Sequence, residues 1–343
     1  MRAVVMRGRS LVVDEVPEPV PGPGQVLVET VACGICGSDK QALDYTDEFL
    51  QASRDSGVPT FEFDPSRDVV MGHEIAARVI SAGPDTPHTE GQLVVALPWA
   101  IDHVGQIHGV GFSNDFPGGY GERMVLQAMA LEPIPDHVPP HVAALTEPLA
   151  VGFGNVARTG IGADGTGIVI GCGPVGLGAV AALAERGVAP IIASDPSKLR
   201  RDTALRLGAH RVVDPAVEDP IEVWREAAAP GQLLHIWVCA AVPGLLNELL
   251  YKAPRQTTIL QVGAVMTDDV IRPIVGIYKD ISLQMCMVYP HEEYAKTLGR
   301  IADGTVDASS LITDQVGLSG VAGAIEALRH PDDHIQILVR PDL

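Results

Sequence analysis

The 343-residue sequence is poor in several residue types, and each scarcity narrows the class of protein. It has only five cysteines, an odd number, which is typical of reduced thiols rather than of a disulfide-stabilised secreted domain. Lys and Arg number 24 against 43 Asp and Glu, and a formal charge of −19 argues against a nucleic-acid-binding surface. The sequence contains no internal repeat and no low-complexity segment. We therefore expect a soluble, cytoplasmic protein without a nucleic-acid partner.

Long uncharged runs are equally scarce: there is one, and its composition is unlike that of a membrane-spanning helix. Residues 165–184 carry no charge and are long enough to cross a bilayer. Six of these residues are Gly, one is Pro, and the apolar period changes midway from that of a strand to that of a helix. The first residues, Met1 to Val5, read as a strand and not as a signal peptide. We expect no membrane partner.

The same run contains the most informative motif present. The apolar segment Ile168–Ile170 leads into Gly171-Cys172-Gly173-Pro174-Val175-Gly176, a G-x-G-x-x-G pattern followed by an Ala-rich helical stretch. Such glycines let the backbone approach a pyrophosphate, which the free N–H groups of the helix N-terminus bind. A second apolar strand ends in Asp195, 19 residues after Gly176, the spacing of the carboxylate that binds the adenosine ribose. The sequence predicts a dinucleotide-binding βαβ unit.

The rest of the chain shows two kinds of organisation. From about residue 151 to 288, strand patterns alternate with helical patterns, as a parallel sheet requires. Up to about residue 150 there are many short strands separated by Gly/Pro turns. A strand pattern returns at 334–339. The chain is long enough for two domains, each with a substantial core.

A set of metal-ligand residues lies in the first part. Cys36 and His73 are 37 positions apart, so a fold and not a local loop must bring them together. Glu74 follows His73 directly, and Glu147 lies in a Glu-Pro-Leu-Ala-Val-Gly run. Thiolate, imidazole and carboxylate are the ligands of catalytic Zn²⁺, which takes three from the protein and leaves a fourth position open.

These motifs occur in the order of a known family. Cys33-Gly34-Ile35-Cys36-Gly37-Ser38-Asp39, Gly72-His73-Glu74, Gly118-Gly119-Tyr120-Gly121-Glu122, Glu147-Pro148-Leu149 and the nucleotide motif resemble the zinc-dependent alcohol dehydrogenases of the medium-chain dehydrogenase/reductase superfamily. The resemblance covers nearly the whole length. The run from Glu147 to Gly152 is similar to the polyol and threonine dehydrogenases, which have a Glu where other members have a third Cys ligand.

The resemblance implies an α/β fold with two domains. A β-rich, GroES-like catalytic domain is expected over 1–150, completed by 289–343, and a doubly wound Rossmann domain over 151–288. The active site would lie in the cleft between them. The resemblance also implies a homo-oligomer, either a dimer or a tetramer. Its nucleotide-binding domains would pair edge to edge through a strand near the end of the domain, and the apolar run 281–288 is suited to that role.

Residue roles follow from the same resemblance. Cys36 and His73 would bind one catalytic zinc, while Cys33 packs in the core. Glu74 would either bind the metal or hold one of its ligands, and Glu147 would be the third ligand or lie near it. Ser38 would pass on the alcohol proton, and Asp39 would pair with an arginine behind the site. The residues expected to bind NAD are Gly171, Gly173, Pro174, Val175, Gly176, Asp195, Arg200 and Val262.

The implied reaction is hydride transfer between an alcohol, with secondary alcohols and polyols favoured, and NAD, with zinc as the Lewis acid. Two alternatives stay open. One is a zinc-free enone or quinone reductase of the same superfamily, which a measurement of the zinc content per chain would distinguish from a zinc-dependent alcohol dehydrogenase. The other is a non-enzymatic nucleotide-binding protein, which a broad alcohol panel would separate.

The sequence also departs from the family in places. Residues 97–117 contain no cysteine, so the four-cysteine structural zinc site of many members cannot form, and His103 and His108 there are expected to be simply solvated. The segment between Cys36 and His73 is longer than expected, with the surplus in 44–68 as either a lid or a surface elaboration. Gln41 stands where many members have a proton-accepting histidine, and Ala77 where a Gly is usual.

Overall fold

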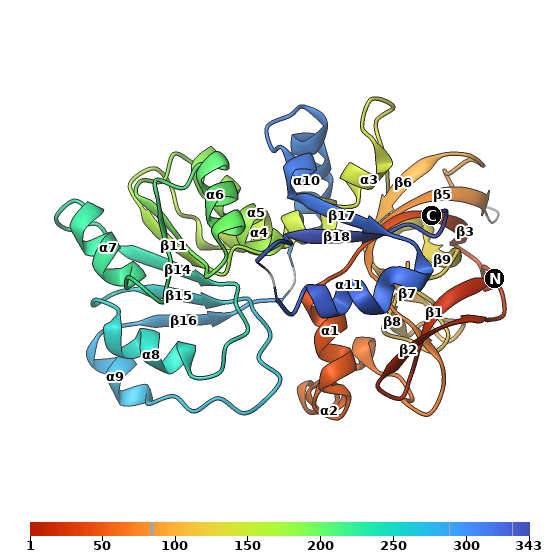
Figure 1. Cartoon of the computed structure of the whole chain (residues 1–343), viewed down its shortest axis with the longest axis horizontal. Helices are drawn as coiled ribbons and strands as arrows, with labels where there is room; N and C mark the ends of the chain where they lie inside the picture. Colours follow the sequence, from red (N-terminus) through yellow and green to blue (C-terminus); the bar gives the residue numbers. More distant parts are fainter. Residues whose placement is uncertain (83–85, 288, 331) are drawn as a thin grey trace. The chain divides into compact units, whose positions relative to one another are not determined.

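The computed structural model describes the whole chain except residues 83–85, 288 and 331. The chain forms two compact units. Unit 1 comprises Met1–Glu147, Leu298–His330 and Gln336–Leu343, and unit 2 comprises Pro148–Thr297 and Pro331–Ile335. The expected boundary after residue 288 falls on a position outside the described residues, and unit 1 resumes at Leu298. Both chain termini belong to unit 1 (Figure 1).

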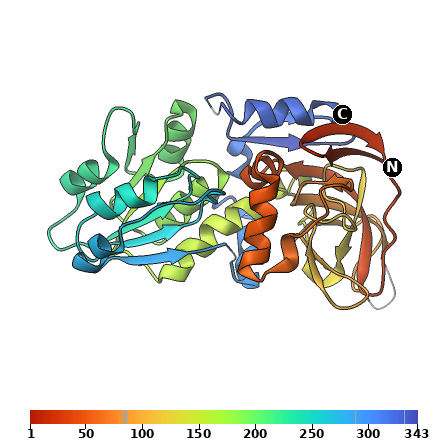
Figure 2. The same ribbon diagram turned by 90° about the horizontal axis from the view of Figure 1, so that it is seen from below.

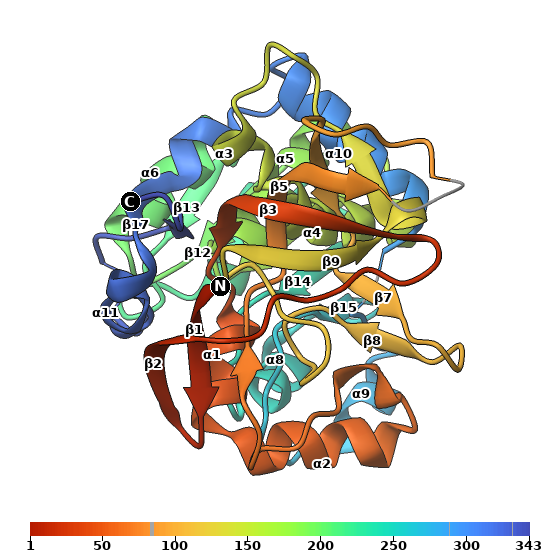
Figure 3. The same cartoon turned by 90° about the vertical axis from the view of Figure 1, so that its right-hand side faces the viewer.

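Unit 1 is built around a mixed sheet in which β3 is central. The strand order is β10-β6-β5-β3-β18-β17, and β9 also pairs with β3. These strands are β3 (Gln25–Gly34), β5 (Glu74–Ala82), β6 (Leu93–Ala96), β9 (Arg123–Gln127), β10 (Leu131–Pro133), β17 (Ile312–Val316) and β18 (Gln336–Val339). Figure 3 shows β3 running across the unit between β5 and β9.

Smaller elements complete unit 1. A second sheet has the order β2-β1-β4, and β7 pairs with β8. The strands are β1 (Arg2–Arg7), β2 (Ser10–Glu15), β4 (Val69–Val70), β7 (Trp99–Ile101) and β8 (Ile107–Gly109). The helices are α1 (Gly37–Asp44), α2 (Thr46–Ser56), α3 (Pro140–Ala143) and α11 (Val321–Ala327), with 3₁₀ turns η1 (Pro59–Phe61), η2 (Ala128–Ala130), η3 (Ala308–Leu311) and η4 (Leu318–Gly320).

Unit 2 has a parallel sheet with helices on both faces. The strand order β13-β12-β11-β14-β15-β16 is the doubly wound dinucleotide-binding order. The strands are β11 (Thr166–Ile170), β12 (Ile191–Ser194), β13 (Arg211–Val213), β14 (Leu234–Val238), β15 (Thr258–Gln261) and β16 (Ser282–Met285). The helices are α4 (Thr146–Thr159), α5 (Pro174–Glu185), α6 (Lys198–Arg206), α7 (Pro220–Ala227), α8 (Leu245–Lys252), α9 (Pro273–Tyr278) and α10 (His291–Ala302); α4 and α10 each contain residues of both units.

Alternation along the strands explains why helices cover both faces of this sheet. On one face, Ile168 and Ile236 join a core cluster with Trp224 of α7 and Leu249 of α8. Successive side chains point to opposite faces of a strand, so Trp237 lies on the other face, where its indole N–H donates to the carbonyl of Asn155 in α4, 3.4 Å away. Strands buried on both faces read as continuous apolar runs, which is what the sequence shows.

The structure confirms the α/β fold class and divides the uncharged run of residues 165–184 between β11 and α5. None of the helices among the described residues combines the length and the hydropathy that a membrane span needs. In this part of the chain the change of apolar period therefore marks a strand followed by a helix.

Candidate active site

The pairing of β3 with β5 brings the candidate metal ligands of unit 1 together. Cys36 precedes α1, immediately after β3, and His73 precedes β5. Glu74, the first residue of β5, lies opposite Gly34 in the register. One ligand atom from each of Cys36, His73 and Glu74 lies within 4.8 Å of the others. This is the one such group found among the described residues, and it is able to hold one metal ion.

The carboxylate of Asp39 lies beside the His73 ring. Its Oδ1 lies 3.2 Å from Nδ1 of His73, although the two atoms are not aligned for a hydrogen bond. Its Oδ2 accepts from the backbone N–H of Cys36 at 3.0 Å and from the Tyr120 hydroxyl at 2.8 Å. The other ring nitrogen, Nε2, lies 3.4 Å from Ser38 Oγ. A carboxylate behind a metal-binding histidine is a common support of zinc sites.

These contacts correct one sequence-based expectation. Asp39 was predicted to pair with an arginine, and in the described structure its partners are His73, Cys36 and Tyr120. The residue next to Glu74 is a neutral amide, Gln336 of β18, whose Nε2 lies 2.5 Å from Oε2 of Glu74.

The electrostatics of this group fit a divalent cation. Burial, followed by the charge of Glu147, raises the pKa of Glu74 to about 8. Burial also raises the pKa of Cys36. Burial lowers the pKa of His73, but the charges of Asp39 and Cys36 outweigh it, and the net pKa lies well above its usual range. A buried thiol and carboxyl that resist ionisation alone become ligands when a cation supplies the compensating charge.

Ser38 and Glu147 lie close to the ligand group in different ways. Ser38 is part of the first turn of α1, and its hydroxyl faces His73. Glu147 lies in the first turn of α4, is 8% exposed, and acts on Glu74 through its charge. Cys33, in contrast, is fully buried in the unit 1 core.

The long segment after Cys36 folds as part of unit 1. Its helices α1 and α2 are the orange-red ribbons of Figure 2. Phe49 of α2 packs on Phe61, Phe63 and Phe112, with ring centroids 5.2–6.5 Å apart. The ring of Phe112 in turn lies 5.1 Å from that of His73. The phenylalanines of this segment therefore continue the hydrophobic core up to a candidate metal ligand.

Residues 97–117, which contain no cysteine, include side chains held by hydrogen bonds and ring contacts. Residues 99–109 form the β7–β8 hairpin, in which His108 Nε2 lies 3.1 Å from Asp102 Oδ2. The His108 ring also lies against Phe116, with centroids 5.3 Å apart. The prediction that His108 is simply solvated is thus wrong, because a hydrogen bond to Asp102 and a ring contact hold it in place.

In unit 2 the glycine motif forms the turn between β11 and α5. Gly171 has a φ of +90°, which side chains disfavour, and a Cβ at Gly176 would lie 1.8 Å from the carbonyl oxygen of Gly171. Pro174 is the first residue of α5, where its missing N–H costs nothing. The backbone geometry and close packing of this turn therefore require glycine at both 171 and 176. Val175 lies in the first turn of α5. Val262 follows β15, and its N–H donates to the carbonyl of Val238.

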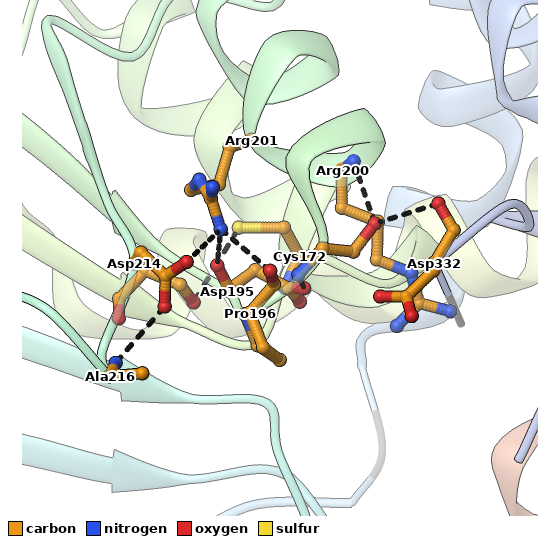
Figure 4. A network of polar contacts seen from close by, with 10 residues as sticks. Cys172, Asp195, Pro196, Arg200, Arg201, Asp214, Ala216 and Asp332 are labelled. Atoms are coloured by element: carbon orange, nitrogen blue, oxygen red, sulfur yellow. Dashed lines mark hydrogen bonds and ion pairs between the residues drawn. The ribbon is translucent and has the colours of Figure 1, made fainter. Parts of the chain in front are cut away.

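Asp195 follows β12 and braces the glycine turn. Its carboxylate is 3% exposed and accepts from the backbone N–H of Cys172 at 2.7 Å and of Ser197 at 2.8 Å. Figure 4 shows the two arginines that follow. Arg201 donates to the carbonyls of Asp195 and Pro196, both at 2.7 Å, and lies 3.2 Å from Asp214. Arg200 donates from Nε to the carbonyl of His334 at 3.1 Å.

Comparison with known proteins agrees with both units. Residues 22–136 match the alcohol dehydrogenase GroES-like domain, and residues 174–303 match the zinc-binding dehydrogenase domain. The (R,R)-butanediol dehydrogenase of Neisseria gonorrhoeae is 28% identical over 346 residues, covering 96% of each chain. The L-threonine 3-dehydrogenase of Thermococcus kodakarensis is 31% identical over 269 residues, covering 71% of this chain and 73% of that protein.

A solved structure shows the same fold. The 2R,3R-butanediol dehydrogenase of Bacillus subtilis superposes with a TM-score of 0.81 at 24% identity, covering 99% of both chains. The fold and the Cys–His–Glu group define a medium-chain dehydrogenase with a metal site. The chain belongs to the family of zinc-binding dehydrogenases. It is a zinc-dependent oxidoreductase of the alcohol dehydrogenase type.

Proposed function

We propose that the substrate is a small secondary alcohol whose neighbouring carbon bears a hydroxyl group, and that Cys36, His73 and Glu74 bind the zinc. The buried Cys36–His73–Glu74 group carries the proposal. Relatives named for butanediol, sorbitol and threonine support the substrate class, because each of these molecules has a secondary alcohol beside a carbon bearing a hydroxyl or amino group.

The residues of the site would divide the work as follows. Zinc, when bound, supplies Lewis-acid polarisation of the substrate oxygen, and the nicotinamide accepts the hydride. Asp39, whose Oδ1 lies 3.2 Å from Nδ1 of His73, would orient the ring so that Nε2 can bind the metal. The Phe112 ring packs against the His73 ring, with centroids 5.1 Å apart. The hydroxyl of Ser38 is placed to take the first proton from the substrate alcohol.

A substrate panel tests this proposal. Formation of NADH should be fastest with vicinal diols, slower with simple secondary alcohols and slowest with primary alcohols. Equal rates for primary alcohols and diols would contradict the substrate class, and no turnover of any alcohol would contradict the activity itself.

The domain roles and location belong to the same proposal. We assign metal and substrate binding to residues 1–150 with 289–343, and dinucleotide binding to 151–288. The five cysteines are all unpaired in the structure, which supports a reducing, cytoplasmic location.

NAD is expected to be preferred over NADP. The Asp195 carboxylate would repel a 2′-phosphate, and the guanidinium groups of Arg200 and Arg201 are already engaged by carbonyls and by Asp214. Asp195→Asn should lower the NAD:NADP ratio of kcat/KM by about tenfold or more, since each 1.4 kcal/mol is a factor of ten. A wild-type enzyme that used NADP more efficiently would refute the assignment.

We also expect a homo-oligomer that pairs through β16. This strand is the last in the sheet order. Met285, its final residue, is 71% exposed, and Met287 just after it is 57% exposed. Val288, which belongs to the run predicted for this role, lies outside the described residues. Because an unpaired apolar edge promotes association, Met285→Lys should shift the protein toward monomer. Light scattering at micromolar concentration measures this, and a monomeric wild type would contradict it.

A further inference from the structure

Gln336 is the buried neighbour of Glu74 that no sequence motif pointed to. It begins β18, is 1% exposed, and its Nε2 lies 2.5 Å from Oε2 of Glu74, which is also 1% exposed. The two residues are 262 positions apart and meet because β18 and β5 both pair with β3.

The absence of a side chain at Gly34 leaves the space that this pair occupies. Gly34 of β3 lies opposite Glu74, and a Cβ there would lie 1.8 Å from Glu74 Oε2 and 2.4 Å from Gln336 Nε2. The backbone of β3 therefore makes room for the carboxylate and the amide together. Two buried polar groups joined in this way satisfy each other, and removal of one leaves the other without its partner.

The donor at this position is neutral, and that matters for a metal site. An amide fixes one carboxylate oxygen without cancelling its charge, whereas a lysine or arginine would compete with a cation for it. The carboxylate and the Cys36 thiol then supply the negative charge that a divalent ion requires, with His73 as the uncharged ligand.

We propose that Gln336 is the positioning residue of the zinc site: its amide holds Oε2 of Glu74 so that the remaining oxygen of this carboxylate faces Cys36 and His73 as a ligand. This rests on the proposed function, in which those residues bind zinc. It assigns Glu74 to the metal directly and leaves Glu147 as a neighbouring charge.

Zinc affinity measured by competition with a chromogenic chelator tests the proposal. Gln336→Met keeps the length of the side chain and removes the donor. It should raise the zinc dissociation constant about 10–100-fold, the usual effect of losing a group that orients a ligand. The visible absorption of the cobalt-substituted protein should shift as well, because the ligand carboxylate is no longer fixed.

Two further variants separate positioning from general destabilisation. Gln25→Met is the matched control, because Gln25 is a buried glutamine of β3 (6% exposed) whose amide donates to the carbonyl of Ile101. It should leave zinc affinity and the cobalt spectrum unchanged. In a Glu74→Gln background, Gln336→Met should have no additional effect, since the residue acts through Glu74.

The outcomes distinguish this inference from the function on which it rests. A wild-type protein that binds no zinc would contradict the proposed function. If the wild type binds one zinc and the zinc dissociation constant of Gln336→Met lies within about threefold of the wild-type value, only the role of Gln336 is overturned. Equal weakening by Gln25→Met, or additive effects of Gln336→Met and Glu74→Gln, would overturn it too.

Discussion

Replacing Cys36 with alanine is expected to remove the bound zinc and to lower kcat/KM by about 10³-fold or more. The thiolate is one of three candidate ligands, and its charge offsets that of the metal. Lewis-acid activation contributes several kcal/mol to such reactions, and each 1.36 kcal/mol is worth a factor of ten. Steady-state kinetics with a vicinal diol, together with elemental analysis of the purified variant, measure both effects.

Cys33 provides the matched control for this substitution. It lies three residues earlier and is fully buried in the unit 1 core. Cys33→Ala should therefore reduce thermal stability while leaving zinc content and kcat/KM close to the wild-type values. If Cys33→Ala lost zinc as completely as Cys36→Ala, the assignment of Cys36 as the ligand would be wrong.

Replacing Ser38 with alanine should lower kcat by about 10²-fold or more, the usual range for a positioned proton transfer. The Ser38 hydroxyl lies 3.4 Å from Nε2 of His73, beside the ligand group, and the proposed relay begins there. The measurement is kcat as a function of pH at saturating NAD, with zinc content determined on the same sample to show that the metal is retained.

Gln41 is the comparison for this relay. It occupies the position where many members of the family have a histidine, and a neutral amide cannot take up a proton near neutral pH. We expect Gln41→Ala to cost little in kcat, with ordered water or another side chain completing the path. Equal damage from Gln41→Ala and Ser38→Ala would show that the amide is essential and that this relay is incorrect.

The start of the nucleotide-binding unit could be predicted from the sequence because its determinants are local. The glycine motif, the apolar run before it and the Ala-rich run after it predict a turn, a strand and a helix, and the structure has them there. The gathering of Cys36, His73 and Glu74 could also be expected, but only through the family motifs, because nothing local to either segment requires that β3 and β5 pair.

The remaining features depend on contacts between distant parts of the chain. Tyr120 lies within the Gly118–Glu122 motif, but its hydrogen bond to Asp39 joins residues that are 81 positions apart in the sequence. Gln336 has no motif at all and reaches Glu74 only through the position of β18. The contact of Phe49 with Phe112 likewise joins two separate segments of the chain.

The most direct test of the account is titration of the metal-free protein with zinc. After removal of metal by a chelator, bound zinc and the rate of NADH formation from a vicinal diol would be followed on the same sample. We predict that activity is absent at first, rises in proportion to bound zinc and reaches its maximum at one zinc per chain. Full activity in the metal-free protein, or a maximum reached only at two zincs per chain, would contradict the account.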